Sequence, residues 1–425
     1  MAPVVRVVAM AALVSLFAAA AARAQEEGFG YRGIENGARH ARTAEREEIR
    51  STARHMDIRL TAAEIYDSNV SRSSGVVAAG RRLTPQDWIF KPGVKIDAVE
   101  PVGGQTLFLN GSLGYDFYAH NPRLNREDID VDGGLQSEFG PCHDEARDKY
   151  ARHLRDLEGV ASPKLITSTE SRETIDITAA CGNGFGFTPR VGVNEDWTNF
   201  SSKKLRQSDS HTFGLDAALG YGQPALGLVS IFGAYRRTVF PNELLFGFIP
   251  VKGGYQLWAG GVSVEHDVAS LIHGSASVSY TALNPSLAGV PAFKGITYAF
   301  DLRYTPTKRL EAGVRFTRAT LPSRRPGSSF TIETSEKLSA RYELGPRMKL
   351  ETGASISDRK YSGAVGGPAL RIAQETRYEG FGAVNYEFGR RWSLDLDVRH
   401  IQRDANPSTF SYADTRVTLT AAARF

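Results

Sequence analysis

The final segment of the chain constrains the fold more than any other feature. Its residues alternate in character from Arg416 to Phe425, and every second position from Val417 onward is apolar. Arginine, threonine and alanine fill the positions between them. A β-strand points successive side chains to opposite faces, so this segment presents one apolar face and one mostly polar face. The pattern is typical of a strand in a membrane β-barrel, where one face meets lipid and the other a polar lumen.

The same alternation recurs upstream over much of the chain. It appears within residues 107–117, 128–139, 213–221, 298–304 and 394–399. A soluble β-sandwich can alternate in this way too, because one face of each sheet packs on a core. The pattern persists from about Asp57 to Phe425 without a helical domain between, which favours one large barrel.

The expected connections alternate in length. Short turns are predicted near residues 100–104, 140–142, 182–184, 223–227, 268–271, 305–308, 345–347 and 389–391. Longer polar stretches occur at 71–85, 201–208, 241–252, 284–294, 322–328 and 362–370. Short periplasmic turns and longer extracellular loops are typical of outer-membrane barrels. We therefore predict an all-β fold, a single transmembrane antiparallel β-barrel of about 18 strands.

One segment fits this interpretation poorly. Ala146, Tyr150 and Leu154 recur at the spacing of a helix, and the alternation around them is weak. We predict a strand here, because single-chain bacterial barrels have an even number of strands.

The first 24 residues read as an export signal. Arg6 precedes the uncharged apolar run of residues 7–22, and Ala22-Arg23-Ala24 fits an A-x-A cleavage site. The run is shorter than the ~20 residues that span a bilayer as a helix. We predict a signal peptide over residues 1–24, a polar periplasmic leader over 25–56 and a barrel over 57–425. The expected location is the outer membrane of a Gram-negative bacterium.

Two cysteines, Cys142 and Cys181, are present. A pair in an exported chain suggests a disulfide, although two unpaired thiols remain the alternative. The predicted strands place both residues at neighbouring strand ends on the periplasmic rim, within the short reach of a disulfide.

Charged residues inside the predicted strands are the best functional candidates. Arginine or lysine on the lipid face at the midplane costs about 2–4 kcal/mol, so these side chains are expected to face the lumen. The candidates are Lys91, Lys95, Arg236, Arg303, Arg315, Arg341, Arg377, Asp395, Asp397 and Arg399. Both signs are present, so a wetted wall without selectivity is an equally open interpretation.

Sequence motifs for bond chemistry are not found. The chain has no phosphate-binding loop and no H-E-x-x-H, and its nine histidines lack metal-ligand spacing. We expect no cofactor and no enzymatic activity. His266 and His400 could each serve a barrel lipase, but lumen or rim positions are favoured. A net charge of +4 is too balanced to indicate a nucleic-acid partner.

Several short motifs together resemble a known family. They are Tyr66-Asp67-Ser68-Asn69-Val70, Trp88-Ile89-Phe90-Lys91-Pro92-Gly93, the two cysteines with the Gly184–Pro189 run after them, and the C-terminal strand. From about Tyr66 to Phe425 the chain resembles the putative β-barrel porin family of proteobacterial outer membranes, whose members often accompany exopolysaccharide gene clusters. The resemblance implies an outer-membrane barrel and, for some members, polysaccharide export. The terminal Phe425 is similar to the signal read by the barrel-assembly machinery.

These observations lead to one functional expectation and its alternatives. We expect a porin-like channel that passes hydrophilic solute. The more specific expectation is a channel that exports exopolysaccharide. The partners would be outer-membrane lipid, the barrel-assembly machinery and, for export, periplasmic polysaccharide export components. A general small-solute porin, a lipid-modifying enzyme and a structural barrel that binds an outside partner remain alternatives.

Overall fold

The computed structural model describes residues 54–425 except 155–166, 183–184, 204, 246–248, 269–270, 288–289, 323–329 and 363–372. The predicted signal peptide and residues 25–53 of the predicted leader lie outside the described residues. In the described part, no helix is both long enough and apolar enough to cross a membrane.

The chain folds into one sheet of 18 antiparallel strands in sequence order. The strands are β1 (His55–Asp67), β2 (Asp87–Val102), β3 (Gln105–Tyr118), β4 (Arg126–Phe139), β5 (Cys142–Leu154), β6 (Thr169–Cys181), β7 (Gly186–Phe200), β8 (Ser210–Gln223), β9 (Gly227–Leu245), β10 (Ile249–Val268), β11 (Ile272–Pro285), β12 (Phe293–Thr307), β13 (Leu310–Pro322), β14 (Phe330–Gly345), β15 (Met348–Ser362), β16 (Gln374–Phe388), β17 (Trp392–Asn406) and β18 (Tyr412–Arg424). β18 pairs with β1, with Ala423 opposite Leu60, and this pairing closes the barrel. The predicted fold class is confirmed.

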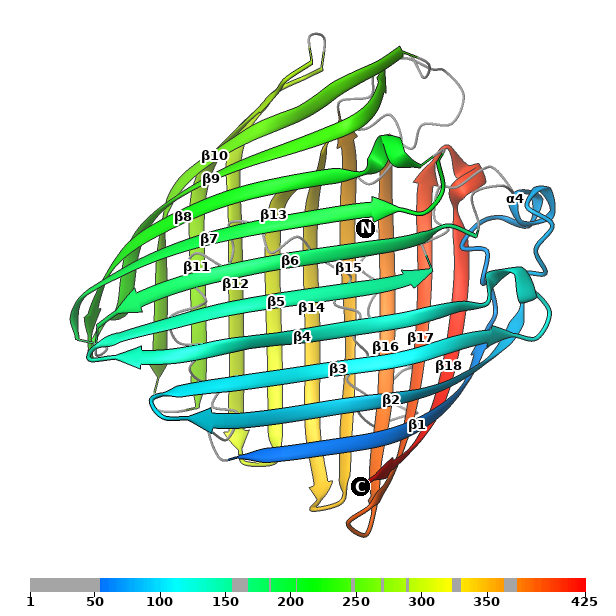
Figure 1. Ribbon diagram of the computed structural model, residues 1–425, viewed down its shortest axis with the longest axis horizontal. Coiled ribbons are helices and arrows are strands. Elements are labelled where there is room, and N and C mark those ends of the chain that lie inside the picture. The colour runs from blue at the N-terminus through cyan, green and yellow to red at the C-terminus, as the bar shows by residue number, and fades with distance from the viewer. Residues whose placement is uncertain are drawn as a thin grey trace, which may run out of the picture.

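The strands are strongly tilted around the barrel. In Figure 1, β1 to β9 run across the nearer wall, whereas β11 to β18 run nearly upright on the far wall. Strands on opposite walls cross steeply when all strands of a barrel tilt in the same sense relative to its axis.

The ambiguous segment 146–154 is a strand. It lies in β5, where Ala146 pairs with Leu135 of β4 and with Ile177 of β6. Cross-strand pairing on both sides outweighs the helix-like spacing of its apolar residues, because tertiary context overrides weak local propensity.

One predicted connection is wrong. The first strand itself begins at His55, two residues before the approximate start at Asp57, because His55 and Met56 already pair with β2. The predicted long loop at 241–252 is largely strand. Here β9 and β10 extend their ladder through a register shift between Val251 and Gly253.

Connections at the two ends of the barrel differ as predicted. Turns such as residues 103–104 and 140–141 are short, and they share their end of the barrel with the starting residue of β1 and with Phe425. The other end carries the loops with helix α4 (Gly75–Gly80) and the short helices η1 (Pro122–Leu124), η2 (Arg206–Ser208) and η3 (Ser408–Phe410). Short turns define the periplasmic end, so the loop end is extracellular.

At this extracellular end, the first two loops pack onto the inner wall. Val70 and Leu83 from the β1–β2 loop and Leu124 from η1 form an apolar cluster with Ile65 and Ile89. This cluster fixes the loops against the tops of β1 and β2.

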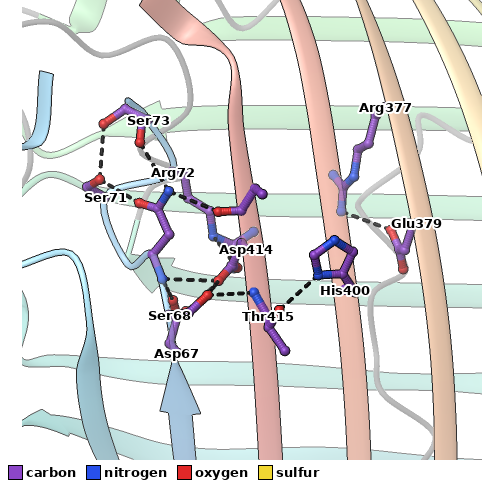
Figure 2. Close-up of polar contacts among 12 residues, drawn as sticks. Asp67, Ser68, Ser71, Arg72, Ser73, Arg377, Glu379, His400, Asp414 and Thr415 are labelled. Carbon is purple, nitrogen blue, oxygen red and sulfur yellow. Dashed lines mark hydrogen bonds and ion pairs between the residues drawn. The ribbon is translucent and has the colours of Figure 1, made fainter. Parts of the chain in front are cut away.

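A polar network joins the same loop to β18 (Figure 2). Ser68 Oγ and the Asn69 backbone N–H both donate to Asp414 Oδ1, each over 3.1 Å. The Thr415 N–H donates to Ser68 Oγ over 2.7 Å. The Tyr-Asp-Ser-Asn-Val sequence therefore supplies side chains that hold the extracellular end of the β1–β18 junction.

Candidate functional site: the barrel lumen

Alternating side chains divide the barrel wall into an outer and an inner face. On β3, Leu107, Leu109 and Leu113 are exposed on the outer face, whereas Phe108 between them is buried. Asn110 and Asp116 share the inward side with Phe108. The outer face is apolar and the inner face is largely polar, as expected for a barrel that spans lipid and surrounds water.

All ten predicted lumen candidates lie at inward positions of this alternation. Arg303, for example, lies between the outward Leu302 and Tyr304, and Asp397 lies between Leu396 and Val398. The registers of neighbouring strands keep each of these residues on the inward side.

Arg315, Arg377 and Arg399 form the shortest ion pairs among the predicted arginines. Arg315 Nε donates to Asp301 over 2.7 Å on the neighbouring strand β12. Arg399 and Arg377 both donate to Glu379, over 2.9 and 3.0 Å. Glu379 therefore links two cations along β16 and β17.

The other candidates have varied surroundings. Lys91 pairs with Asp128, Arg236 donates to Asn194, Arg303 lies 3.6 Å from Glu311, Arg341 lies 3.4 Å from Glu351, and Asn385 donates to Asp395. Lys95 interacts electrostatically with Asp395 without a direct ion pair among the described residues. Asp397 is buried on the same wall.

Sequence reasoning missed a second set of inward ion pairs. They are Arg147–Asp132, Arg172–Asp196, Arg359–Glu333 and Arg403–Glu375. Each joins adjacent strands, so only the strand register could have revealed them. Asp132 lies opposite Lys149 and thus diagonal to Arg147, a relation that the sequence alone does not fix.

Some of the inward charges are exposed to solvent. The side chains of Arg315 and Arg341 are 48% and 42% exposed, and Asp97 is 47% exposed. These residues point away from the lipid-facing side, so the space that they reach is the interior. The interior along β2, β13 and β14 is therefore wetted.

Another part of the inner wall is packed instead. Thr281 and Thr297 are buried and hydrogen-bonded to each other over 2.7 Å, and Thr212 bonds Thr238 over 2.9 Å. Beyond them, Leu257 and Phe240 belong to an apolar cluster. These threonines and the apolar cluster therefore form a packed section of the wall between β8 and β12.

The described residues do not assemble a recognisable catalytic set. His400 Nδ1 lies 2.8 Å from Thr415 Oγ1 (Figure 2), but both residues share the outward face with Val398 and Val417. No carboxylate orients His400 within the described structure. The described residues also contain no group of three His, Cys, Asp or Glu side chains that could hold a metal ion.

The two cysteines form a disulfide in the structure. Cys142 begins β5, Cys181 ends β6, and they lie directly opposite each other with Cα atoms 3.9 Å apart. The bond lies at the short-turn end, and it ties two strands whose other ends lead into residues 155–166.

Comparison with protein families supports this description. The family described as "Putative beta-barrel porin 2" matches residues 253–425, which run from β10 to the C-terminus. The resemblance inferred from the sequence is confirmed over this part. The chain is an outer-membrane β-barrel of the porin type.

Solved structures with a similar architecture are distant in sequence. OccK2 (OpdF) of Pseudomonas aeruginosa, crystallised with glucuronate, is 9% identical with a TM-score of 0.47, and the match covers 87% of this chain and 98% of OccK2. OccAB3 of Acinetobacter baumannii is 10% identical with a TM-score of 0.44, over 87% and 99% of the two chains. The FrpB iron transporter of Neisseria meningitidis is 9% identical with a TM-score of 0.46, over 83% of this chain and 62% of FrpB. No curated protein matches the chain.

Proposed function

We propose that this barrel is a passive channel for small hydrophilic solutes across the outer membrane. The observation that carries the proposal is the water-exposed charge on the inward face, exemplified by Arg315 and Arg341. A barrel of this size is wide enough to hold an aqueous channel. Solute would diffuse along the wetted β2, β13 and β14 wall without any bond being made or broken.

The ion pairs on the inner wall determine which ions the channel would favour. Most inward arginines have a carboxylate neighbour, such as Arg399 with Glu379. Paired charges keep the wall hydrated without a strong net field, so we expect weak discrimination between small cations and anions. Export of a polysaccharide through the same lumen, with periplasmic export components, stays a prediction.

A thiol-modification experiment tests both whether the lumen conducts and which side chains of the wall face it. On β15, Ser355 faces inward and its neighbour Ala354 faces outward. We expect steady single-channel openings of the mature protein, residues 25–425, in a planar bilayer. A charged methanethiosulfonate reagent should reduce the conductance of Ser355→Cys and leave the matched control Ala354→Cys unchanged. The described cysteines are both disulfide-bonded, so they would not react.

Two outcomes would contradict the proposal. The first is the absence of openings from a barrel that still shows heat-modifiable folding on a gel. The second is an unchanged conductance of modified Ser355→Cys, which would mean that the described interior does not conduct.

A further inference from the structure

The outer face of β5 carries a carboxylate in the middle of the apolar belt. Asp148 is the central residue of β5, and it lies opposite Gly133 of β4 and Ile175 of β6. It shares its side of the strand with Ala146, whose partner Ile177 is exposed on the outer surface. Asp148 is itself exposed. Its carboxylate therefore points into the region that the membrane occupies.

This position is unusual for the molecule. The other outward ionisable residues in the described part lie in the extracellular halves of their strands or beside the periplasmic turns. Glu64, Glu173 and Glu195 are of the first kind, and Glu100 and His266 are of the second. Glu173 lies opposite Tyr150, two residues above Asp148, and the other named residues lie nearer the two ends of the barrel, so lipid covering Asp148 would surround it with hydrocarbon.

A carboxylate among acyl chains has no hydrogen-bond donor. Its burial in hydrocarbon without a partner costs free energy, and polar residues in membranes typically find protein partners. Around Asp148, Gly133 and Ala146 are small, so another backbone can approach closely. The surface therefore suits a protein neighbour better than it suits lipid.

The complementary donor lies on the same strand. Tyr150 is two residues from Asp148 and faces outward with Val131. No hydrogen bond or ion pair joins Asp148 or the Tyr150 hydroxyl to another described residue. The face thus holds an acceptor, Asp148, and a donor, Tyr150, side by side, and the exposed Glu173 of β6 lies opposite Tyr150.

We propose that the β5 face, defined as Gly133, Ala146, Asp148, Tyr150 and Ile175, binds the β5 face of a second copy of this chain. A two-fold axis along the membrane normal keeps every residue at its own depth. It brings Asp148 of each copy within reach of the partner's Tyr150, because the two residues differ by only two steps along a tilted strand. The two hydrogen bonds are reciprocal, as a self-complementary interface requires. This interface is independent of whether the lumen conducts.

Cross-linking in the native membrane tests the proposal. Ala146→Cys places a thiol on the β5 face, and Ala354→Cys places one on the outer face of β15 as the matched control. Oxidation of intact outer membranes should give a disulfide-linked dimer of Ala146→Cys and leave Ala354→Cys monomeric.

The contribution of the Asp148–Tyr150 hydrogen bonds is measured separately, from the stability of the dimer. Asp148→Leu and Tyr150→Phe should each weaken the dimer in mild detergent by roughly tenfold or more, measured by light scattering at several concentrations. Asp148→Asn keeps an acceptor oxygen, so it should retain most of the dimer. Heat-modifiable folding of every variant would exclude simple misfolding as the cause.

Three results would overturn the proposal. They are a monomeric wild-type protein without Ala146→Cys cross-links, cross-links to a different protein alone, and a trimer rather than a dimer.

Discussion

At the scale of single residues, the wall is stabilised unevenly by its ion pairs. The Arg403 and Glu375 side chains are 0% and 1% exposed, and Arg403 Nε donates to Glu375 over 2.9 Å. Tyr361 also donates to Glu375, over 2.8 Å. Arg315, in contrast, pairs with Asp301 while half-exposed to the lumen. The same chemical pair should therefore contribute very differently at the two sites.

We predict that Arg403→Met lowers the free energy of unfolding by about 3–5 kcal/mol, because it removes the closer of the two cations that pair with the buried Glu375 carboxylate. The remaining ion pair from Arg359 and the hydrogen bond from Tyr361 favour the lower end of that range. The control Arg315→Met should cost about 0–1 kcal/mol, since water screens that pair. Urea titration of the folded barrel in detergent, followed by its gel mobility, measures both. Equal losses of unfolding free energy in Arg403→Met and Arg315→Met would refute the predicted difference between the two ion pairs.

At the scale of strands, two inward phenylalanines cover glycines on the neighbouring strand. Phe108 lies opposite Gly134, and Phe381 lies opposite Gly353. A Cβ added to Gly353 would lie 2.6 Å from both the Phe381 ring and the Leu338 carbonyl oxygen. The glycine thus creates the space in which the ring packs across two strands.

We predict that Gly353→Ala destabilises the barrel by about 1–3 kcal/mol, the usual cost of overpacking. Gly380, on the adjoining strand β16, has no atom within 4 Å of an added Cβ, so Gly380→Ala is the matched control. The urea midpoint should fall for the first variant and change little for the second. A fall of similar size in both would show that strand propensity, rather than the Phe381 contact, sets the effect.

At the scale of the whole molecule, the C-terminal residue is the best candidate for an assembly signal. Phe425 is 77% exposed at the periplasmic end, and its N–H donates to Ile58 O over 3.0 Å. Its side chain contributes little packing that would explain a large effect on stability.

We predict that Phe425→Ala lowers the amount of folded barrel in the outer membrane several-fold but leaves refolding in detergent unchanged. Phe388→Ala is the control, because Phe388 is also outward and exposed at the same end. Immunoblots of heated and unheated membrane fractions measure the folded amount. Equal reduction in both variants would argue against a specific signal at Phe425.

The sequence predicted some of these features and not others, for physical reasons. The alternation of apolar and polar residues along one strand is enough to predict that Arg303 and Asp397 face inward. One partner of Lys91, Asp128, is 37 residues away on β4, so its identity depends on a register that distant turns determine. On β5, Asp148 occupies an outward position where an apolar residue was expected, which explains why that strand alternates poorly.

The pairing of β1 with β18 has a consequence for the order in which the chain is made. β1 is synthesised before β18. Until β18 pairs with it, the backbone donors and acceptors opposite residues 416–424 stay open on β1 as an unpaired edge. A chain cut short anywhere before β18 could form most of the wall but would keep that edge. Truncated chains should therefore bind periplasmic chaperones or be degraded by periplasmic proteases, whereas full-length chains should form the closed barrel.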